Sequence, residues 1–363
     1  MECFGKLTWN KYTRDELEKL SIQKPDEETR KQVLKNWDAI AKPIDGFGRF
    51  ETLTAQIGAI TRNEQIDISK KAVIIMCADN GIVEENVSQS GQNVTVAVAK
   101  SIAEKQSCVC RMAEAAGADT IPVDVGINRT GEIAGVLNKK IRCGTRNFSK
   151  EAVMTEEETI RAVAVGIDLA ASLKKAGYQI LATGEMGIGN TTTSSAMAAA
   201  LLRREVSEVT GRGAGLSDAG LLHKQQVIEK AIRKYHLYDA DAFTILKTVG
   251  GLDIAGLTGV CIGGAIYHVP VVLDGVISLV AALTAEKIIP GTKDYLLASH
   301  KGKEPAAELL LKELKKEAVL DAKLALGEGT GAVMMFPLLD MVRNVYHAGT
   351  NFSDIQIEQY QRF

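Results

Sequence analysis

Ala72-Val73-Ile74-Ile75-Met76 is an unbroken apolar run, preceded by Lys70-Lys71 and followed by Asp79-Asn80-Gly81. An apolar run of this length between polar boundaries is typical of a strand that is buried on both faces. Such strands lie at the centre of parallel sheets, where helices cover both sides. This stretch therefore predicts an α/β fold.

Short apolar segments alternate with longer helical patterns on both sides of this run. We expect further strands at residues 120–125, 179–183, 269–273 and 295–298, and helices at 95–116, 156–175, 192–203, 276–288, 304–317 and 330–347. The alternation predicts a Rossmann-like parallel sheet with flanking helices and right-handed crossovers. Ligands bind at the carboxyl ends of such strands, and here those ends carry polar, glycine-rich residues.

The uncharged stretch Ile254–Leu273 is about as long as a membrane span. However, it contains His268, Pro270 and glycines at 256, 259, 263 and 264, so it is better interpreted as a tightly packed helix followed by a strand. The N-terminus is charged throughout, which does not fit a secretory signal. We expect a cytoplasmic protein that does not enter the membrane.

Both ends of the chain are expected to form a small helical domain. The first residues are charged, and Asp15–Leu20 and Thr29–Ile40 have amphipathic helical patterns. The predicted division assigns residues 1–65 and 340–363 to the small domain, and 66–339 to the large α/β catalytic domain.

Composition excludes several classes of function. The formal net charge of -2 offers no basic surface for nucleic acid or for an anionic membrane. The six cysteines form no CxxC pair, so a disulfide framework is not expected in a chain this large. The five histidines show no spacing that suits a metal site or a catalytic triad.

The segment Gly184-Glu185-Met186-Gly187-Ile188-Gly189-Asn190-Thr191-Thr192-Thr193 lies between an expected strand and an expected helix. Its glycines allow a sharp turn and a close approach to a ligand. Asn190 and the threonines supply helix-capping side chains where unpaired N–H groups can hold a phosphate. Glu185 would then face another part of the ligand, such as ribose hydroxyls. The alternative is a tight turn before a capped helix, since neither the Walker A nor the dinucleotide pattern is present.

A second glycine-rich segment, Gly211-Arg212-Gly213-Ala214-Gly215, follows no expected strand. Lys224 lies about a helix length downstream of it, and together they are candidates for a second phosphate contact. Taken alone, a lysine such as Lys224 is more often a solvated surface residue.

Gly327-Glu328-Gly329-Thr330-Gly331 places one carboxylate among glycines, immediately before an apolar helix. Glu328 could cap that helix through its dipole. Alternatively, it is a general base whose small neighbours leave room for a substrate. The apolar flanks, including Leu324 and Leu326, would suit a carboxylate with a raised pKa.

Short motifs are spread along nearly the whole chain, and each is weak alone. They are Ala41-Lys42-Pro43 with Gly48-Arg49, Cys77–Gly81, Val94-Thr95, Asp124-Val125-Gly126, Gly184–Thr192, Gly250–Asp253, Leu273-Asp274-Gly275, Ser299-His300 and Gly327–Gly331. In this order they are specific, and the chain resembles the nicotinate-nucleotide–dimethylbenzimidazole phosphoribosyltransferase family.

The resemblance implies a pentosyltransferase of cobalamin biosynthesis. An aromatic base attacks C1′ of nicotinate mononucleotide, nicotinate leaves, and inversion gives the α-ribotide of the cobamide lower ligand. Glu328 would take the N–H proton of the attacking base, and Glu185 would orient the ribose or assist Glu328. The resemblance also implies a homodimer, with the small domain made from both chain termini. The reaction needs no metal or organic cofactor.

The resemblance also assigns binding residues. For the phosphoribosyl group they are Gly187, Ile188, Gly189, Asn190, Thr191, Gly213 and Lys224, and for the base they are Ser90, Met186 and Leu326.

The base pocket departs from the family pattern at Ser90–Thr95. Where the family carries a proline-containing stretch and then a glutamine, this chain reads Ser90-Gly91-Gln92-Asn93-Val94-Thr95, with Val98 in place of the glutamine. The preferred base is therefore open among 5,6-dimethylbenzimidazole, other benzimidazoles, purines and phenolic bases. Two alternative functions are a subunit of a heteromeric phosphoribosyltransferase for phenolic bases and a non-catalytic nucleotide-binding protein.

Overall fold

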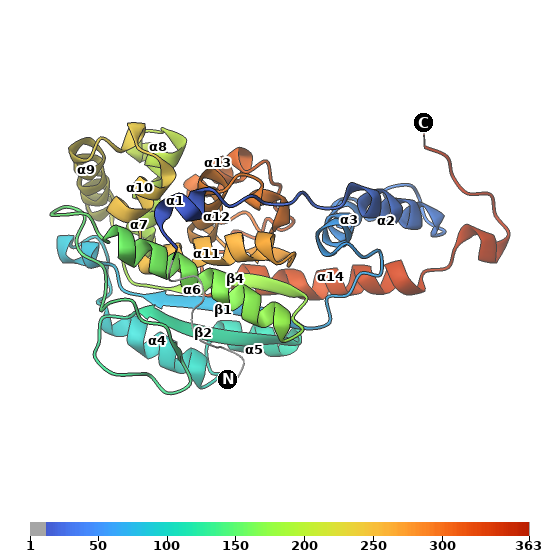
Figure 1. Cartoon of the computed structure of the whole chain (residues 1–363), viewed down its shortest axis with the longest axis horizontal. Coiled ribbons are helices and arrows are strands. Elements are labelled where there is room, and N and C mark those ends of the chain that lie inside the picture. The colour runs from blue at the N-terminus through green and yellow to red at the C-terminus, as the bar shows by residue number, and fades with distance from the viewer. Residues whose placement is uncertain (1–11, 363) are drawn as a thin grey trace.

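The structure is a computed structural model that describes residues 12–362. The start of the predicted N-terminal unit, with Cys3, lies outside the described residues. Within them, six parallel strands form one sheet in the order β3-β2-β1-β4-β5-β6. Strands β2, β1 and β4 lie side by side in Figure 1. The strands are β1 (Lys71–Ala78), β2 (Ala118–Gly126), β3 (Leu137–Asn138), β4 (Ile180–Met186), β5 (Val271–Leu273) and β6 (Leu296–Ala298). The predicted α/β fold with a parallel sheet is confirmed.

Strand β1 lies at the centre of the sheet, paired with β2 on one side and β4 on the other. All of its residues are buried. Ala72, Ile74 and Met76 belong to one hydrophobic core, whereas Val73 and Ile75 belong to the core on the opposite face. A continuous apolar run is therefore what both faces of this strand require.

Helices α6 (Glu156–Lys175), α11 (Leu252–Ile266) and α12 (Val276–Ile288) contribute to the core on one face of the sheet. The uncharged stretch thus forms α11 and β5, as expected. No helix among the described residues is long and apolar enough to cross a membrane. The outer helices beyond this layer are α7 (Asn190–Leu202), α8 (Val206–Val209), α9 (Asp218–Lys234), α10 (Ala242–Val249) and α13 (Ala306–Glu313).

The opposite face is covered by α4 (Asn93–Ala103), α5 (Cys108–Ala115) and the first half of α14 (Thr330–Ala348). The single helix expected at 95–116 was wrong, because the chain breaks between α4 and α5. Lys105 adopts the left-handed conformation with φ 61°, and the Ser107 hydroxyl then accepts a hydrogen bond from the Cys110 amide at 3.4 Å. The break creates a second capped helix start.

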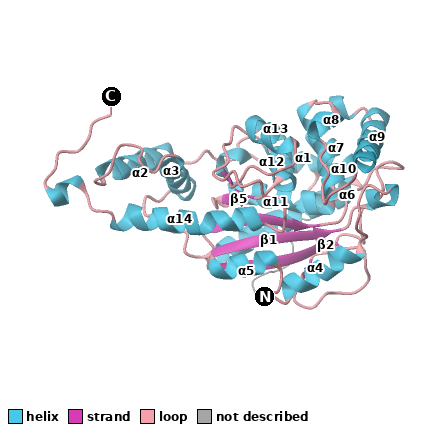
Figure 2. Cartoon of the chain, turned by 180° about the vertical axis from the view of Figure 1, so that it is seen from behind, coloured by secondary structure: helices cyan, strands magenta, loops and turns pink. Residues whose placement is uncertain are grey.

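Helices α2 (Glu27–Ala39) and α3 (Arg49–Thr61) lie beside the distal half of α14, away from the sheet (Figure 2). The rings of Trp37 and Tyr346 are 5.2 Å apart, and Ile40 forms a β-bridge with Asn351. The short helix α1 (Arg14–Glu18) instead lies on the large α/β part, where Arg14 pairs with Asp241 at 2.8 Å.

The strand order reverses between β1 and β4. From β1 the chain moves outward to β2 and β3, and then returns to β4 on the other side of β1. In open parallel sheets, a crevice for ligands forms at the carboxyl ends of the two strands at such a switch point. These ends lead into Asp79-Asn80-Gly81 after β1 and into Gly187 after β4.

Candidate active site

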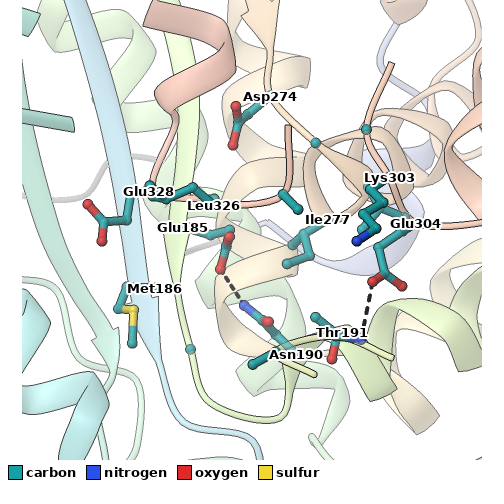
Figure 3. A pocket seen from close by; sticks show the side chains of 18 of the residues that line it. Glu185, Met186, Asn190, Thr191, Asp274, Ile277, Lys303, Glu304, Leu326 and Glu328 are labelled. Atoms are coloured by element: carbon teal, nitrogen blue, oxygen red, sulfur yellow. Dashed lines mark hydrogen bonds between the residues drawn. The ribbon is translucent and has the colours of Figure 1, made fainter. Parts of the chain in front are cut away.

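A cavity opens beyond the carboxyl ends of β4 and β5. Figure 3 shows that its side chains form two groups: one holds Glu185, Met186, Leu326 and Glu328, and the other holds Thr191, Lys303 and Glu304. Segments far apart in the chain therefore build one site.

Most of the site residues expected from the sequence line this cavity. They are Glu185, Met186, Gly187, Ile188, Gly189, Asn190, Thr191, Gly213, Leu326 and Glu328. Lys224 is not part of the lining but is buried directly behind Thr191. Ser90 is also outside the lining, although its neighbours Ser88 and Gln89 belong to it. Ser90 as a base contact stays a prediction.

The loop between β4 and α7 turns on glycines. A side chain on Gly187 would place its Cβ 2.3 Å from the Ala78 carbonyl oxygen, so only glycine fits against the end of β1. Gly189 adopts φ 95° and immediately precedes α7. The expected capping by the Asn190 side chain was wrong, because α7 begins at Asn190 and its amide points into the site instead.

Asn190 connects two buried carboxylates. Its side-chain amide donates to Glu185 Oε2 at 2.5 Å and to Asp253 Oδ2 at 3.0 Å. Burial, together with the negative charge of Asp253, raises the pKa of Glu185 to about 8. Burial also raises the pKa of Asp253 to about 6. Glu185 therefore carries a proton at neutral pH and can donate a hydrogen bond to a ligand.

Lys224 is held at the opposite end of the loop. Its ammonium group donates to Thr191 Oγ1 at 3.1 Å and to the Gly211 carbonyl at 3.2 Å. The side chain is completely buried, and burial lowers its pKa to about 8. The structure thus supports a buried lysine over the solvated surface lysine that the sequence left open.

The Gly213 amide, an expected phosphate donor, already has a partner. It donates to Glu304 Oε1 at 3.1 Å, so a carboxylate lies where a phosphate oxygen would be expected. Glu304 was not identified from the sequence, because only the fold brings it to the 211–215 segment, 91 residues away along the chain.

Glu328 lies on a tight loop directly before α14. Gly327, Glu328 and Gly329 all adopt left-handed conformations, with φ of 88°, 61° and 93°. One carboxylate oxygen of Glu328 accepts from the Val109 amide at the start of α5, at 3.5 Å. Burial raises the pKa of Glu328, and the Val109 amide and the Ser107 hydroxyl counteract part of this rise.

Two further acids of the site, Asp253 and Asp274, were noted in the sequence only as parts of motifs. Asp274 follows β5 and accepts hydrogen bonds from the start of α14. A polar residue after an apolar strand was the available signal for Asp274, but the contact itself depends on the fold. Within residues 12–362, no group of three or more His, Cys, Asp or Glu side chains is arranged to hold a metal ion.

The fold and the site together define a class of protein. A glycine loop, a buried lysine and two carboxylates meet at the carboxyl end of β4, one of the two strands at the switch point of a Rossmann-like sheet, as a site for a phosphorylated nucleotide requires. A phosphoribosyltransferase family model matches residues 22–357. The chain is a phosphoribosyltransferase.

Individual relatives define the family more closely. The chain is 40% identical over 336 residues to nicotinate-nucleotide–dimethylbenzimidazole phosphoribosyltransferase of Clostridium acetobutylicum, which covers 93% of this chain and 96% of that protein. The protein of the same name from Ruminiclostridium cellulolyticum is 40% identical, over 94% of this chain and 97% of its own. The solved structure of CobT from Thermus thermophilus superimposes with a TM-score of 0.87 at 33% identity, over 92% of this chain and all of that one. The chain belongs to the nicotinate-nucleotide–dimethylbenzimidazole phosphoribosyltransferase family.

Proposed function

We propose that this enzyme moves the 5-phosphoribosyl group of nicotinate mononucleotide to 5,6-dimethylbenzimidazole or a related aromatic base. The product is an α-ribotide that serves as the lower-ligand nucleotide of a cobamide. The observation that carries the proposal is the pair Glu185 and Glu328, two carboxyl groups in one cavity whose pKa values are both raised.

Glu328 acts as the general base. An imidazole nitrogen of the acceptor forms a bond to C1′ while the bond from C1′ to the pyridinium nitrogen breaks. Nicotinate leaves with that electron pair and needs no acid, because its ring was cationic. The N–H proton on the acceptor's other nitrogen moves to Glu328, so deprotonating the acceptor is the task left to the protein. Protonated Glu185 donates to a ribose hydroxyl.

The nucleotide is held at the other group of side chains. The 5′-phosphate lies between the β4–α7 loop and the 211–215 segment, with Gly187, Ile188, Gly189, Thr191, Gly213 and the charge of Lys224 around it. There it displaces the Glu304 carboxylate from the Gly213 amide. Asn190 keeps Glu185 in place beside the ribose. Fixing the phosphate fixes C1′ against the acceptor, which lowers the entropic cost of the reaction.

The acceptor base lies beside Glu328, between Met186 and Leu326. Leu326 is an exposed apolar residue of the cavity, as expected of a group that a flat aromatic ligand covers. Ser90 lies outside the cavity lining, next to Ser88 and Gln89, and we propose it as a further contact of the base.

The test is to incubate the purified enzyme with nicotinate mononucleotide and 5,6-dimethylbenzimidazole. We expect nicotinate release matched by a ribotide whose anomeric configuration, determined by nuclear magnetic resonance, is α. Release without α-ribotide, or no release, would contradict the proposal. A competition among benzimidazole, purine and phenolic acceptors, scored by product mass, then identifies the preferred base.

We further propose a cytoplasmic homodimer. Of the predicted small unit, residues 1–65 and 340–363, helix α1 packs on the catalytic unit of residues 66–339, so we propose the small unit without this helix. Exposed apolar side chains at Met334 and Met341 of α14 support a subunit contact on this helix.

A further inference from the structure

We propose that Asp274 is a positioning residue that holds the general base Glu328 in its working place. The inference rests on the proposed function of Glu328 and adds a residue to it. Asp274 is separated from Glu328 by 54 positions in the chain and acts on it through the start of α14.

Asp274 closes the N-terminal end of α14. Its Oδ1 accepts from the amides of Gly331 at 2.9 Å and Ala332 at 3.1 Å, and its Oδ2 accepts from the Gly329 amide at 3.2 Å. The first amides of a helix have no partner within the helix, and α14 has no side-chain cap of its own. The side chain of Asp274, which follows β5, supplies that cap. Asp274 is only 4% exposed.

The segment that Asp274 holds is strained. Glu328 is the only residue with a side chain in the left-handed run from Gly327 to Gly329, and this conformation costs a non-glycine residue about 1 kcal/mol or more. The run passes close over β4, since a Cβ added to Gly184 would lie 2.5 Å from the Glu328 carbonyl oxygen. Such a conformation persists only when its surroundings fix it. The bond from the Gly329 amide to Asp274 fixes the residue next to Glu328.

Asp274 also acts on Glu328 through its charge. The groups that face the Glu328 carboxylate are Glu185 from β4, Asp274 from the end of β5, and Ser107 and the Val109 amide from α5. Negative charge at Asp274 favours the protonated form of Glu328 and so raises its pKa. His300 Nδ1 lies 4.0 Å from Asp274 Oδ1.

The test is Asp274→Asn, which keeps the size of the side chain and removes its charge. We expect kcat to fall by about 10- to 100-fold, because a base displaced by about 1 Å loses roughly that much rate. KM for nicotinate mononucleotide should change by less than about threefold, because Asp274 lies away from the phosphate end. The acidic limb of the kcat–pH profile should move to lower pH by about half a unit or more, since a like charge has been removed.

The matched control is Asp79→Asn. Asp79 is likewise buried at the end of a strand, here β1, but it accepts from Thr95 Oγ1 at 2.6 Å and from the Asn128 amide at 2.8 Å, away from the Glu328 loop. We expect its acidic limb to coincide with that of the wild type. A purely structural role for Asp274 would give the same unmoved limb in both variants, and that result would overturn the proposal.

A double-mutant cycle distinguishes an effect of Asp274 on Glu328 from a loss of activity through partial misfolding. If Asp274 acts through Glu328, Asp274→Asn should change the residual rate of Glu328→Gln by less than about twofold, because residues acting as a unit are not additive. A full additional loss in that background would refute the inference. If Glu328→Gln itself were fully active, the proposed function of Glu328 would be wrong instead, so the two failures are distinguishable.

Discussion

Lys224 is completely buried, and its ammonium group donates a hydrogen bond to Thr191, which lines the cavity. With its pKa at about 8, the lysine is mostly charged at pH 7 and mostly neutral at pH 9. A bound phosphate dianion stabilises the charged form, so binding must raise this pKa, and affinity must fall as pH rises through 8. We predict that the Kd of nicotinate mononucleotide increases about tenfold from pH 7 to pH 9, measured by calorimetry.

The control for this prediction is Lys224→Met, which keeps the apolar stem and cannot be charged. The variant should bind weakly at both pH values, and its Kd should rise less from pH 7 to pH 9 than that of the wild type, because only the titration of Glu185 remains. A wild-type Kd that is constant from pH 7 to pH 9 would exclude Lys224 as the phosphate partner.

Helices α6 and α11 cross with their backbones in direct contact. A Cβ added to Gly259 would lie 1.9 Å from the Val163 carbonyl oxygen, so the helices would have to separate. We predict that Gly259→Ala lowers the free energy of unfolding in urea by about 3 kcal/mol or more, as overpacking does in a rigid core. Gly220→Ala in α9, where the neighbour is the Leu216 side chain at 3.2 Å, should stay within about 1 kcal/mol of the wild type. Equal effects of the two substitutions would refute this view of the crossing.

Elements with a strong local pattern could be predicted from the sequence. Helix α6 and helix α12 begin and end at the residues that the sequence predicted. The break between α4 and α5 could not be predicted in this way, because Lys105 and Ser107 interrupt a periodic apolar pattern that itself continues. Local periodicity does not reveal a left-handed residue that tertiary contacts stabilise.

The same distinction applies to the candidate site: some of its residues could be identified from the sequence, and others only from the fold. Gly187 and Glu328 stand out locally, because glycines surround them in the chain. The contacts of Asp274 with Gly329 and of Glu304 with Gly213 join segments 55 and 91 residues apart. Only the strand order brings these pairs together, so neither contact follows from spacing. The division of the chain at residues 65 and 340 stays a prediction.

Helix α14 exposes an apolar stripe on the surface of the molecule. Met334 and Met341 lie seven positions apart on one side of the helix, and Met341 is 58% exposed. If this stripe is the subunit contact, a charge there must be desolvated on association. We predict that Met341→Glu shifts the protein from dimer to monomer in sedimentation velocity at micromolar concentration.

The control for the dimer prediction is Leu222→Glu on α9. Leu222 is 57% exposed, so the same charge is introduced at the same exposure on another part of the surface. This variant should sediment as the wild type does. A monomeric wild type, or dissociation by both substitutions, would argue against a subunit contact on α14.

We propose Glu328 as the base that removes the proton of the acceptor in phosphoribosyl transfer. The most direct measurement is the rate of α-ribotide formation by Glu328→Gln at saturating nicotinate mononucleotide and 5,6-dimethylbenzimidazole. We predict a rate about 10²- to 10⁴-fold below that of the wild type, with nucleotide binding retained, because general base catalysis supplies a factor of that size. A Glu328→Gln enzyme that forms α-ribotide at the wild-type rate would contradict the claim.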